Sequence, residues 1–172
     1  IDIPEGNCFG TEALVYMPVG PIDANRTDET NALGEPERDN SLNYATLGFG
    51  GSIIIGFDGA APALEGIDDL EVVETTTGSQ TCETYEERAD IYVSQQLVSD
   101  ASEIDESMFV YVGQSCTNGA SFDVFGETGF DYFTMVKRNV VCALFDMDDA
   151  ALGIQRRNPG AREVEGIRAV IE

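Results

Sequence analysis

The segment Gly48-Phe49-Gly50-Gly51-Ser52-Ile53-Ile54-Ile55-Gly56-Phe57 decides the fold class of this chain. Its glycine-rich start favours a turn, and the β-branched and aromatic residues that follow favour a strand. The three isoleucines are apolar without alternation. We therefore expect a strand that is central and covered on both faces, or one that lies beside a long loop.

Short runs of the same kind recur along the chain between turn-rich segments. This pattern is typical of a β-sandwich rather than of a helical protein. Eight or nine strands in 172 residues fit a jelly roll or a related two-sheet sandwich. The predicted strands are Ala13–Met17, Ser52–Phe57, Leu70–Glu74, Ala89–Ser94, Phe109–Val112, Ser121–Val124, Tyr132–Val136, Val140–Phe145 and Ile167–Ile171. The predicted turns are Gly48–Gly51, Asp58-Gly59, Thr77–Ser79, Thr117–Gly119 and Asn158–Gly160.

Two long polar segments are predicted to be loops. One covers residues 23–43, and the other covers residues 95–106, whose few apolar residues do not hold a helical period. No internal repeat or domain boundary is visible. We expect a single β-sandwich domain over residues 1–172, in which residues 1–12 are a candidate extended N-terminal arm.

The chain is strongly acidic, with 9 Lys and Arg residues against 32 Asp and Glu residues and a net charge of -23. Such a polyanion is not expected to bind nucleic acid. No apolar run approaches the ~20 residues that span a bilayer, so we expect no membrane insertion. Histidine is absent, which excludes Ser-His-Asp and Cys-His catalysis and histidine-ligated zinc. We expect a protein that is not an enzyme.

The four cysteines, Cys8, Cys82, Cys116 and Cys142, are too far apart in sequence for a CxxC redox or zinc motif. An even number at long spacing predicts two disulfides, and four buried thiols are the alternative. Spacing does not choose among the three pairings that four cysteines allow. The sequon Asn25-Arg26-Thr27 makes its asparagine a candidate glycosylation site in a secreted protein.

Several short motifs together resemble one family, from about residue 31 to the C-terminus. Residues 31–37 (NALGEPE) and 44–57 (YATLGFGGSIIIGF) are similar to the "ALGxPD … sLGfGGxixlxF" opening of secreted bacterial cell-surface modules. The further matches are residues 68–76 (DDLEVVETT), Cys82 with residues 85–95 (YEERADIYVSQ), residues 109–113 (FVYVG) with Cys116 and residues 120–123 (ASFD), and residues 164–170 (VEGIRAV).

This resemblance implies a galactose-binding-like jelly roll, an extracellular or cell-surface location and a non-catalytic role. It also implies that Cys82 and Cys116 lie at adjoining strand ends, which leaves Cys8 to pair with Cys142. The chain departs from the family in two places. A longer loop at residues 96–106 replaces a short turn, and Glu163, Glu165 and Gly166 replace aspartates of the closing strand.

Calcium is the candidate structural ion, because hard cations take six to eight oxygen ligands and acidic side chains cluster in the N-terminal loop. Related sandwiches hold such an ion where this loop meets the last strand. The candidate ligands are therefore Asp23, Asp28, Asn31, Glu165 and Glu172, with Glu29 and Glu35 in the same cluster. The alternative is a solvated acidic loop. A second cluster, Asp146, Asp148 and Asp149, lacks the glycine and glutamate of an EF-hand.

The sequence also contains candidates for two other kinds of site, a hydrolytic pair and a glycan-binding face. Glu71 and Glu74 lie three apart on a predicted strand and point to opposite faces, so they do not form a hydrolytic pair; adjacent Glu86 and Glu87 are expected to be solvated. A glycan-binding face needs exposed aromatic side chains. The tyrosines near loops, Tyr16, Tyr44, Tyr85 and Tyr92, are its candidates, whereas Tyr111, Tyr132 and Phe133 are expected in the core.

Self-association is the competing function. Arg156, Arg157, Arg162 and Arg168 concentrate positive charge near the C-terminus, where they can dock on an acidic neighbour or neutralise local glutamates. An N-terminal arm can add a strand to a neighbouring sheet. We therefore expect an extracellular structural or adhesive surface module, such as a filament or surface-layer subunit. The alternative is a calcium-dependent carbohydrate-binding module.

Overall fold

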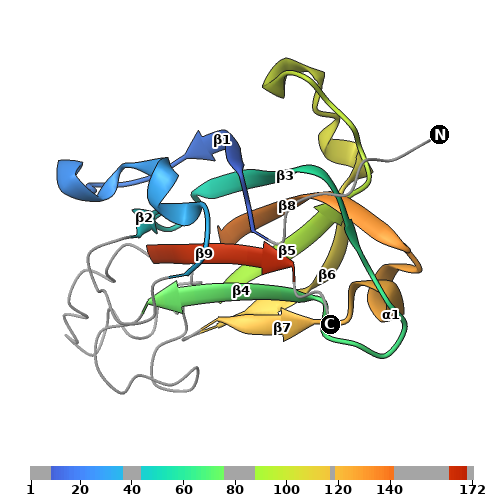
Figure 1. The fold of residues 1–172 in the computed structure, drawn as a ribbon. Helices are drawn as coiled ribbons and strands as arrows, with labels where there is room; N and C mark the ends of the chain where they lie inside the picture. Colours follow the sequence, from blue (N-terminus) through green and yellow to red (C-terminus); the bar gives the residue numbers. More distant parts are fainter. Residues whose placement is uncertain (1–8, 37–43, 76–87, 117–118, 142–162, 170–172) are drawn as a thin grey trace.

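The structure, a computed structural model, describes residues 9–36, 44–75, 88–116 and 119–141, together with the backbone of residues 163–169. These residues form nine strands and five short helices (Figure 1). The strands are β1 (Glu12–Met17), β2 (Ala45–Thr46), β3 (Ser52–Pro62), β4 (Leu70–Thr75), β5 (Arg88–Ser94), β6 (Val110–Ser115), β7 (Ala120–Phe122), β8 (Tyr132–Val141) and β9 (Glu163–Ala169). The helices are the 3-10 turns η1 (Ala24–Arg26), η2 (Glu29–Ala32), η3 (Ala101–Glu103) and η4 (Glu106–Met108), and the α-helix α1 (Val124–Thr128).

The strands build two antiparallel sheets that pack as a sandwich. One sheet has the strand order β1-β3-β8-β5-β6 and the other has the order β2-β9-β4-β7. Figure 1 shows β4 and β9 side by side in one layer, with β3, β8 and β5 in the other. The predicted all-β fold of two sheets is therefore confirmed.

The strand that contains the three isoleucines, β3, is central to its sheet. It pairs with β1 on one side and with β8 on the other, and Ile53, Ile54 and Ile55 are all buried. The turn expected at Asp58-Gly59 is wrong. Both residues have positive φ and lie at a register shift, after which β3 continues to Pro62. A β-bulge accommodates such residues without ending the strand.

Most strand predictions are correct to within a few residues, but β8 corrects two of them. The segments expected as Tyr132–Val136 and Val140–Phe145 belong to one strand that runs through Val141, and residues 142–145 lie outside the described residues. The polar run Lys137-Arg138-Asn139 separates the two predicted segments. The strand continues because alternate residues face outward and the inward one, Arg138, has a buried partner.

Smaller corrections concern the strand ends. β7 stops at Phe122 because Asp123 caps α1, where its carboxylate accepts from the Gly126 N–H. β9 begins earlier than the predicted Ile167–Ile171 and is described as far as Ala169, while residues 170–172 lie outside the described residues. Neither β2 nor α1 was expected. The predicted loops hold for the parts that are described, since residues 23–36 and 95–109 contain only 3-10 turns.

The core lies between the two sheets. Its inward side chains include Ala89, Ile91 and Val93 of β5, which alternate with the outward Asp90 and Tyr92. Phe57 of β3 and Phe133 of β8 pack edge to face with ring centroids 5.5 Å apart. Burial of each large apolar side chain contributes about 1.5–3 kcal/mol, so this interface stabilises the fold.

A buried ion pair crosses the core between the sheets. Arg138 of β8 is fully buried, and its Nη2 lies 2.7 Å from Oε1 of Glu74 on β4. The Ser115 hydroxyl of β6 donates to the same carboxylate oxygen at 2.6 Å. Among the described residues, Nε and Nη1 of Arg138 have no hydrogen-bond partner. Removing either charge would therefore break this ion pair and leave the other charge inside the core.

Two aspartates tie the loop that precedes β4 to α1. The buried Asp69 accepts from the backbone N–H of Leu64 at 2.8 Å and of Val124 at 3.1 Å. Asp123 accepts from Gly66 at 3.0 Å in addition to its helix-capping bond. Burial raises the pKa of Asp69, and the Asp123 charge acts in the same direction, whereas the backbone donors oppose the shift.

The N-terminal prediction is described only in part. Residues 1–8 lie outside the described residues. Thr11 donates through its N–H to the carbonyl of Gly56 at 2.8 Å, and the Gly34 N–H donates to the carbonyl of Gly10 at 2.9 Å. Residues 10 and 11 are therefore hydrogen-bonded within the chain, and the extended arm over residues 1–12 stays a prediction.

Candidate binding face

The carboxylates of the N-terminal loop form local hydrogen bonds. Asp23 caps η1 by accepting from the Asn25 N–H at 3.0 Å, and Asp28 caps η2 by accepting from the Thr30 N–H at 3.0 Å. Asn31 donates through its side chain to the Tyr44 carbonyl at 3.4 Å. Each candidate calcium ligand of this loop thus has a role in shaping the backbone.

Aspartate-capped 3-10 turns also occur in the loop between β5 and β6. Asp100 caps η3 by accepting from Ser102, and Asp105 caps η4 by accepting from Ser107. In these turns and in η2, the hydroxyl of the second residue after the aspartate is the main cause of a lowered aspartate pKa, and the backbone N–H adds to it. Many carboxylates of this acidic chain therefore stabilise tight turns.

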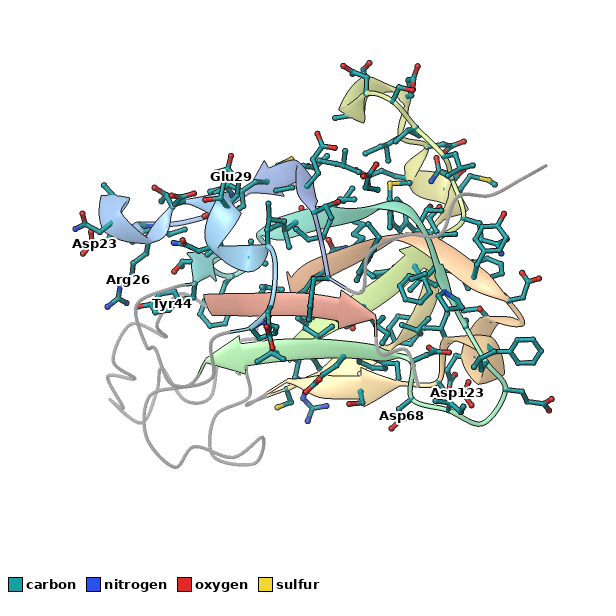
Figure 2. All side chains as sticks on the ribbon, in the orientation of Figure 1. Asp23, Arg26, Glu29, Tyr44, Asp68 and Asp123 are labelled. Atoms are coloured by element: carbon teal, nitrogen blue, oxygen red, sulfur yellow. The ribbon has the colours of Figure 1, made fainter. Side chains whose placement is uncertain are left out.

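Acidic side chains are also spread over the molecule. Figure 2 shows Asp23 and Glu29 at one end of the sandwich and Asp68 and Asp123 at the other. Within the part of the chain whose side chains are described, no group of three or more Cys, Asp or Glu side chains could hold a metal ion. The side chain of Glu165 and the whole of Glu172 lie outside that part. The predicted calcium site is therefore not assembled from the ligands that are described, and it remains a prediction.

The other predicted residues are placed as follows. Asn25 is exposed in η1, so the sequon side chain is accessible. Cys116 is disulfide-bonded, while Cys8, Cys82 and Cys142 lie outside the described residues. Both expected pairings, Cys82 with Cys116 and Cys8 with Cys142, remain predictions. Glu86, Glu87 and the arginines at 156, 157 and 162 also lie outside, and only the backbone of Arg168 is described.

Exposed aromatic side chains gather on the outer face of the five-stranded sheet. Tyr92 of β5 is paired in register with Tyr111 of β6, and their rings lie edge to face with centroids 5.5 Å apart. Tyr111 is 50% exposed and Tyr92 is half-buried. We call these two residues the tyrosine platform.

Two exposure predictions for the tyrosines are wrong. Tyr111 was expected in the core, but it points outward because its neighbour Val112 takes the inward position. Tyr44 was expected to be exposed, but it is only 3% exposed, and the Arg26 guanidinium lies 5.4 Å from its ring centroid (Figure 2). Tyr16 is partly buried and donates through its hydroxyl to the Thr46 carbonyl at 2.7 Å. Tyr85 lies outside the described residues.

A row of polar side chains adjoins the platform. Asp90 lies two residues before Tyr92 on the same face and opposite Gln114 of β6, whose side chain donates to Asp90 at 2.8 Å. Arg88 donates to the other side-chain atom of Gln114 at 3.3 Å, and Asn139 of β8 is in register with Asp90. We call these four residues the polar row. They hold hydrogen-bonding groups beside two exposed aromatic rings.

The loop at residues 95–109 borders the other side of the platform. Its Glu106 forms an ion pair with Lys137, the β8 residue in register with Tyr92. The ammonium group of Lys137 also lies 5.8 Å from the ring centroid of Phe109. Gln96 and Asp105 exchange two hydrogen bonds, of 2.8 and 3.0 Å, across the loop. The side chains bordering the platform are therefore held by fixed contacts.

The platform environment changes the chemistry of one tyrosine. Partial burial raises the pKa of Tyr92, and the negative charge of Asp90 and the neighbouring Tyr111 add to the effect. The Tyr92 phenol is therefore harder to ionise than a free tyrosine side chain.

The catalytic candidates remain apart. Glu74 is engaged between the sheets with Arg138, whereas Glu71, which lies between the core residues Leu70 and Val72, is directed to the opposite face. This geometry agrees with the opposite faces expected for the two glutamates.

None of the helices within the described ranges is long and apolar enough to cross a membrane.

The comparisons with known proteins give no match. No protein-family model matches the chain, and no curated protein matches it. The resemblance to secreted cell-surface modules therefore remains a prediction from the motifs themselves.

Proposed function

We propose that this chain is an extracellular, non-catalytic adhesive module of the galactose-binding-like jelly-roll type, and that it holds a glycan on the tyrosine platform. The strand order supports the jelly-roll part of the proposal. Every strand lies in the opposite sheet from the strand before it, except β6, which pairs with β5. Repeated crossing between two antiparallel sheets is the connectivity that jelly rolls share.

The observation that carries the proposal is the platform with its polar row. Tyrosine offers a rigid, amphipathic surface that loses little conformational entropy on binding. A sugar ring has an apolar C–H face that stacks on an aromatic ring and a rim of hydroxyls that needs donors and acceptors. Tyr92 and Tyr111 supply the aromatic stacking surface. The hydrogen-bonding groups are supplied by Asp90, Gln114 and Asn139.

Other features support an extracellular and non-catalytic role. Cys116 is disulfide-bonded, and disulfides persist mainly in oxidising compartments. The chain has no histidine, and the carboxylate of Glu74 is taken up by a core ion pair. Among the residues that the structure describes, nothing beside the platform provides a matched acid and base.

The calcium site and self-assembly are further proposals. A calcium site would need Glu165 or Glu172 beside the N-terminal loop, and self-assembly would need residues before Phe9. Both depend on parts of the chain outside the described residues. Their tests are given in the Discussion.

A glycan-binding assay with matched variants tests the proposal. Isothermal titration calorimetry with cello-, xylo-, manno- and chito-oligosaccharides measures affinity for wild type, Tyr111→Ala and the control Met17→Ala. Met17 is about equally exposed but lies on β1, at the opposite edge of the same sheet. We expect Tyr111→Ala to weaken binding about tenfold, equivalent to 1.4 kcal/mol, and the control to leave it unchanged. Binding that is equal in all three proteins would contradict the proposal.

A further inference from the structure

We infer that the tyrosine platform selects glycans without carboxylate or sulfate groups and rejects acidic ones. This inference rests on the proposed function and adds the chemical class of the ligand. It follows from which charges lie beside the platform and from the charge of the whole chain.

The basic groups near the platform are poorly placed to receive an anionic sugar. Acidic sugars are bound by Arg or Lys side chains that can pair with the carboxylate or sulfate. Lys137 adjoins Tyr92, but it is only 13% exposed and already pairs with Glu106. Arg88 lies four residues from Tyr92 along β5, and its guanidinium is engaged with the side chain of Gln114, to which it donates at 3.3 Å.

An acidic group occupies the nearer position. Asp90 lies between Arg88 and Tyr92 on the outer face, two residues from the platform. Burial is the main cause of the raised pKa of Tyr92, and the negative charge of Asp90 adds to it. An anion stacked on Tyr92 would therefore meet the Asp90 carboxylate two residues away on the same face.

The net charge of the whole chain also disfavours binding of acidic glycans. A net charge of -23 creates a negative potential around the molecule that repels polyanions and is reduced by salt. A neutral glycan experiences no such repulsion, and its hydroxyls can use Asp90 and the Gln114 carbonyl oxygen as acceptors. The charge distribution is thus complementary to an uncharged or amine-bearing polysaccharide.

The test compares neutral and acidic hexasaccharides on the full chain. Calorimetry is run with cellohexaose, xylohexaose and chitohexaose against hexamers of alginate, polygalacturonate and hyaluronan, at about 50 mM and about 500 mM NaCl. The variants are Tyr111→Ala, Asp90→Asn and the control Met17→Ala. We expect Tyr111-dependent binding of at least one neutral hexamer that changes less than about twofold with salt, and at least about tenfold weaker binding of every acidic hexamer at low salt.

Asp90→Asn should reduce the difference in affinity between neutral and acidic hexamers, because it removes the carboxylate beside the platform. Acidic hexamers that bind as tightly as neutral ones at low salt, in a Tyr111-dependent way, would overturn the inference and leave the proposed function standing. Absence of Tyr111-dependent binding to any hexamer would overturn both. Thermal melts of each variant verify that the fold is intact, so a loss of binding reports the face itself.

Discussion

The buried ion pair between Glu74 and Arg138 leads to a sharp stability prediction. The variants are Arg138→Met, Glu74→Leu and the double variant. Each single change leaves the other charge inside the sandwich, and Arg138 has two further nitrogens without a partner among the described residues. Breaking such a pair costs about 3–5 kcal/mol, whereas replacing both partners with apolar residues is often neutral or stabilising.

We expect each single variant to lower the free energy of unfolding by about 3–5 kcal/mol. For a chain of this size, a loss of 1 kcal/mol lowers Tm by about 2–4 °C, so the expected decrease is of the order of 10 °C. The double variant should lose less than either single variant, because it removes both buried charges. The Ser115 hydroxyl then lacks its carboxylate acceptor, which limits the recovery by about 1 kcal/mol.

Urea denaturation followed by circular dichroism measures the three free energies, with m values used to verify that the same surface is exposed. Ser94→Ala on β5 is a matched control, because it removes a buried hydroxyl that accepts from Gln96 and has no hydrogen bond to this pair. Losses that simply add in the double variant would refute the reasoning. Single losses below about 1 kcal/mol would refute it too, because the charges would then be solvated.

Three further predictions concern pH, calcium and assembly. The pKa of Asp28 is lowered in the folded state, so the stabilisation from its cap is present above the unfolded pKa of about 4 and is lost as pH falls through the folded pKa. Wild type and Asp28→Asn should therefore differ in urea midpoint near pH 6 and converge near pH 2. A difference that does not change with pH would contradict this prediction. If calcium binds a specific site, melting should shift at micromolar-to-millimolar calcium in about 0.5 M NaCl, where screening is saturated, and magnesium at matched ionic strength should not reproduce the shift. Deletion of residues 1–7, which keeps Cys8, should abolish concentration-dependent association in sedimentation velocity and leave a folded monomer; a full-length chain that stays monomeric would contradict self-assembly.

The fold was predictable where the local pattern and the tertiary environment agree. Ile53–Ile55 is apolar throughout because β3 is covered on both faces, so its sequence alone reports its position. The break predicted in β8 shows the limit of this reasoning. Arg138 is compatible with a buried strand only because Glu74, 64 residues away in sequence, supplies the opposite charge. No local pattern contains that pairing.

The binding face was missed for a related reason. Membership in a strand does not say whether Tyr111 faces the core or the solvent; the register with Tyr92 and the bulge between Ile91 and Tyr92 decide it. The aspartate caps did have a local signal. Asp28, Asp100 and Asp105 each stand two residues before a Thr or Ser, which is the spacing of an Asx turn. That spacing explains these carboxylates without a metal ion.

The most direct test of the central claim is an NMR titration of the full-length, isotope-labelled chain with the tightest-binding hexasaccharide from the calorimetric panel. If the tyrosine platform is the binding face, amide shift changes should concentrate at residues 88–94 of β5, residues 110–115 of β6 and residues 137–139 of β8. The amide shifts of the N-terminal loop at residues 23–32 should remain unchanged. Shifts centred on that loop, or on the β4 and β7 sheet, would contradict the account.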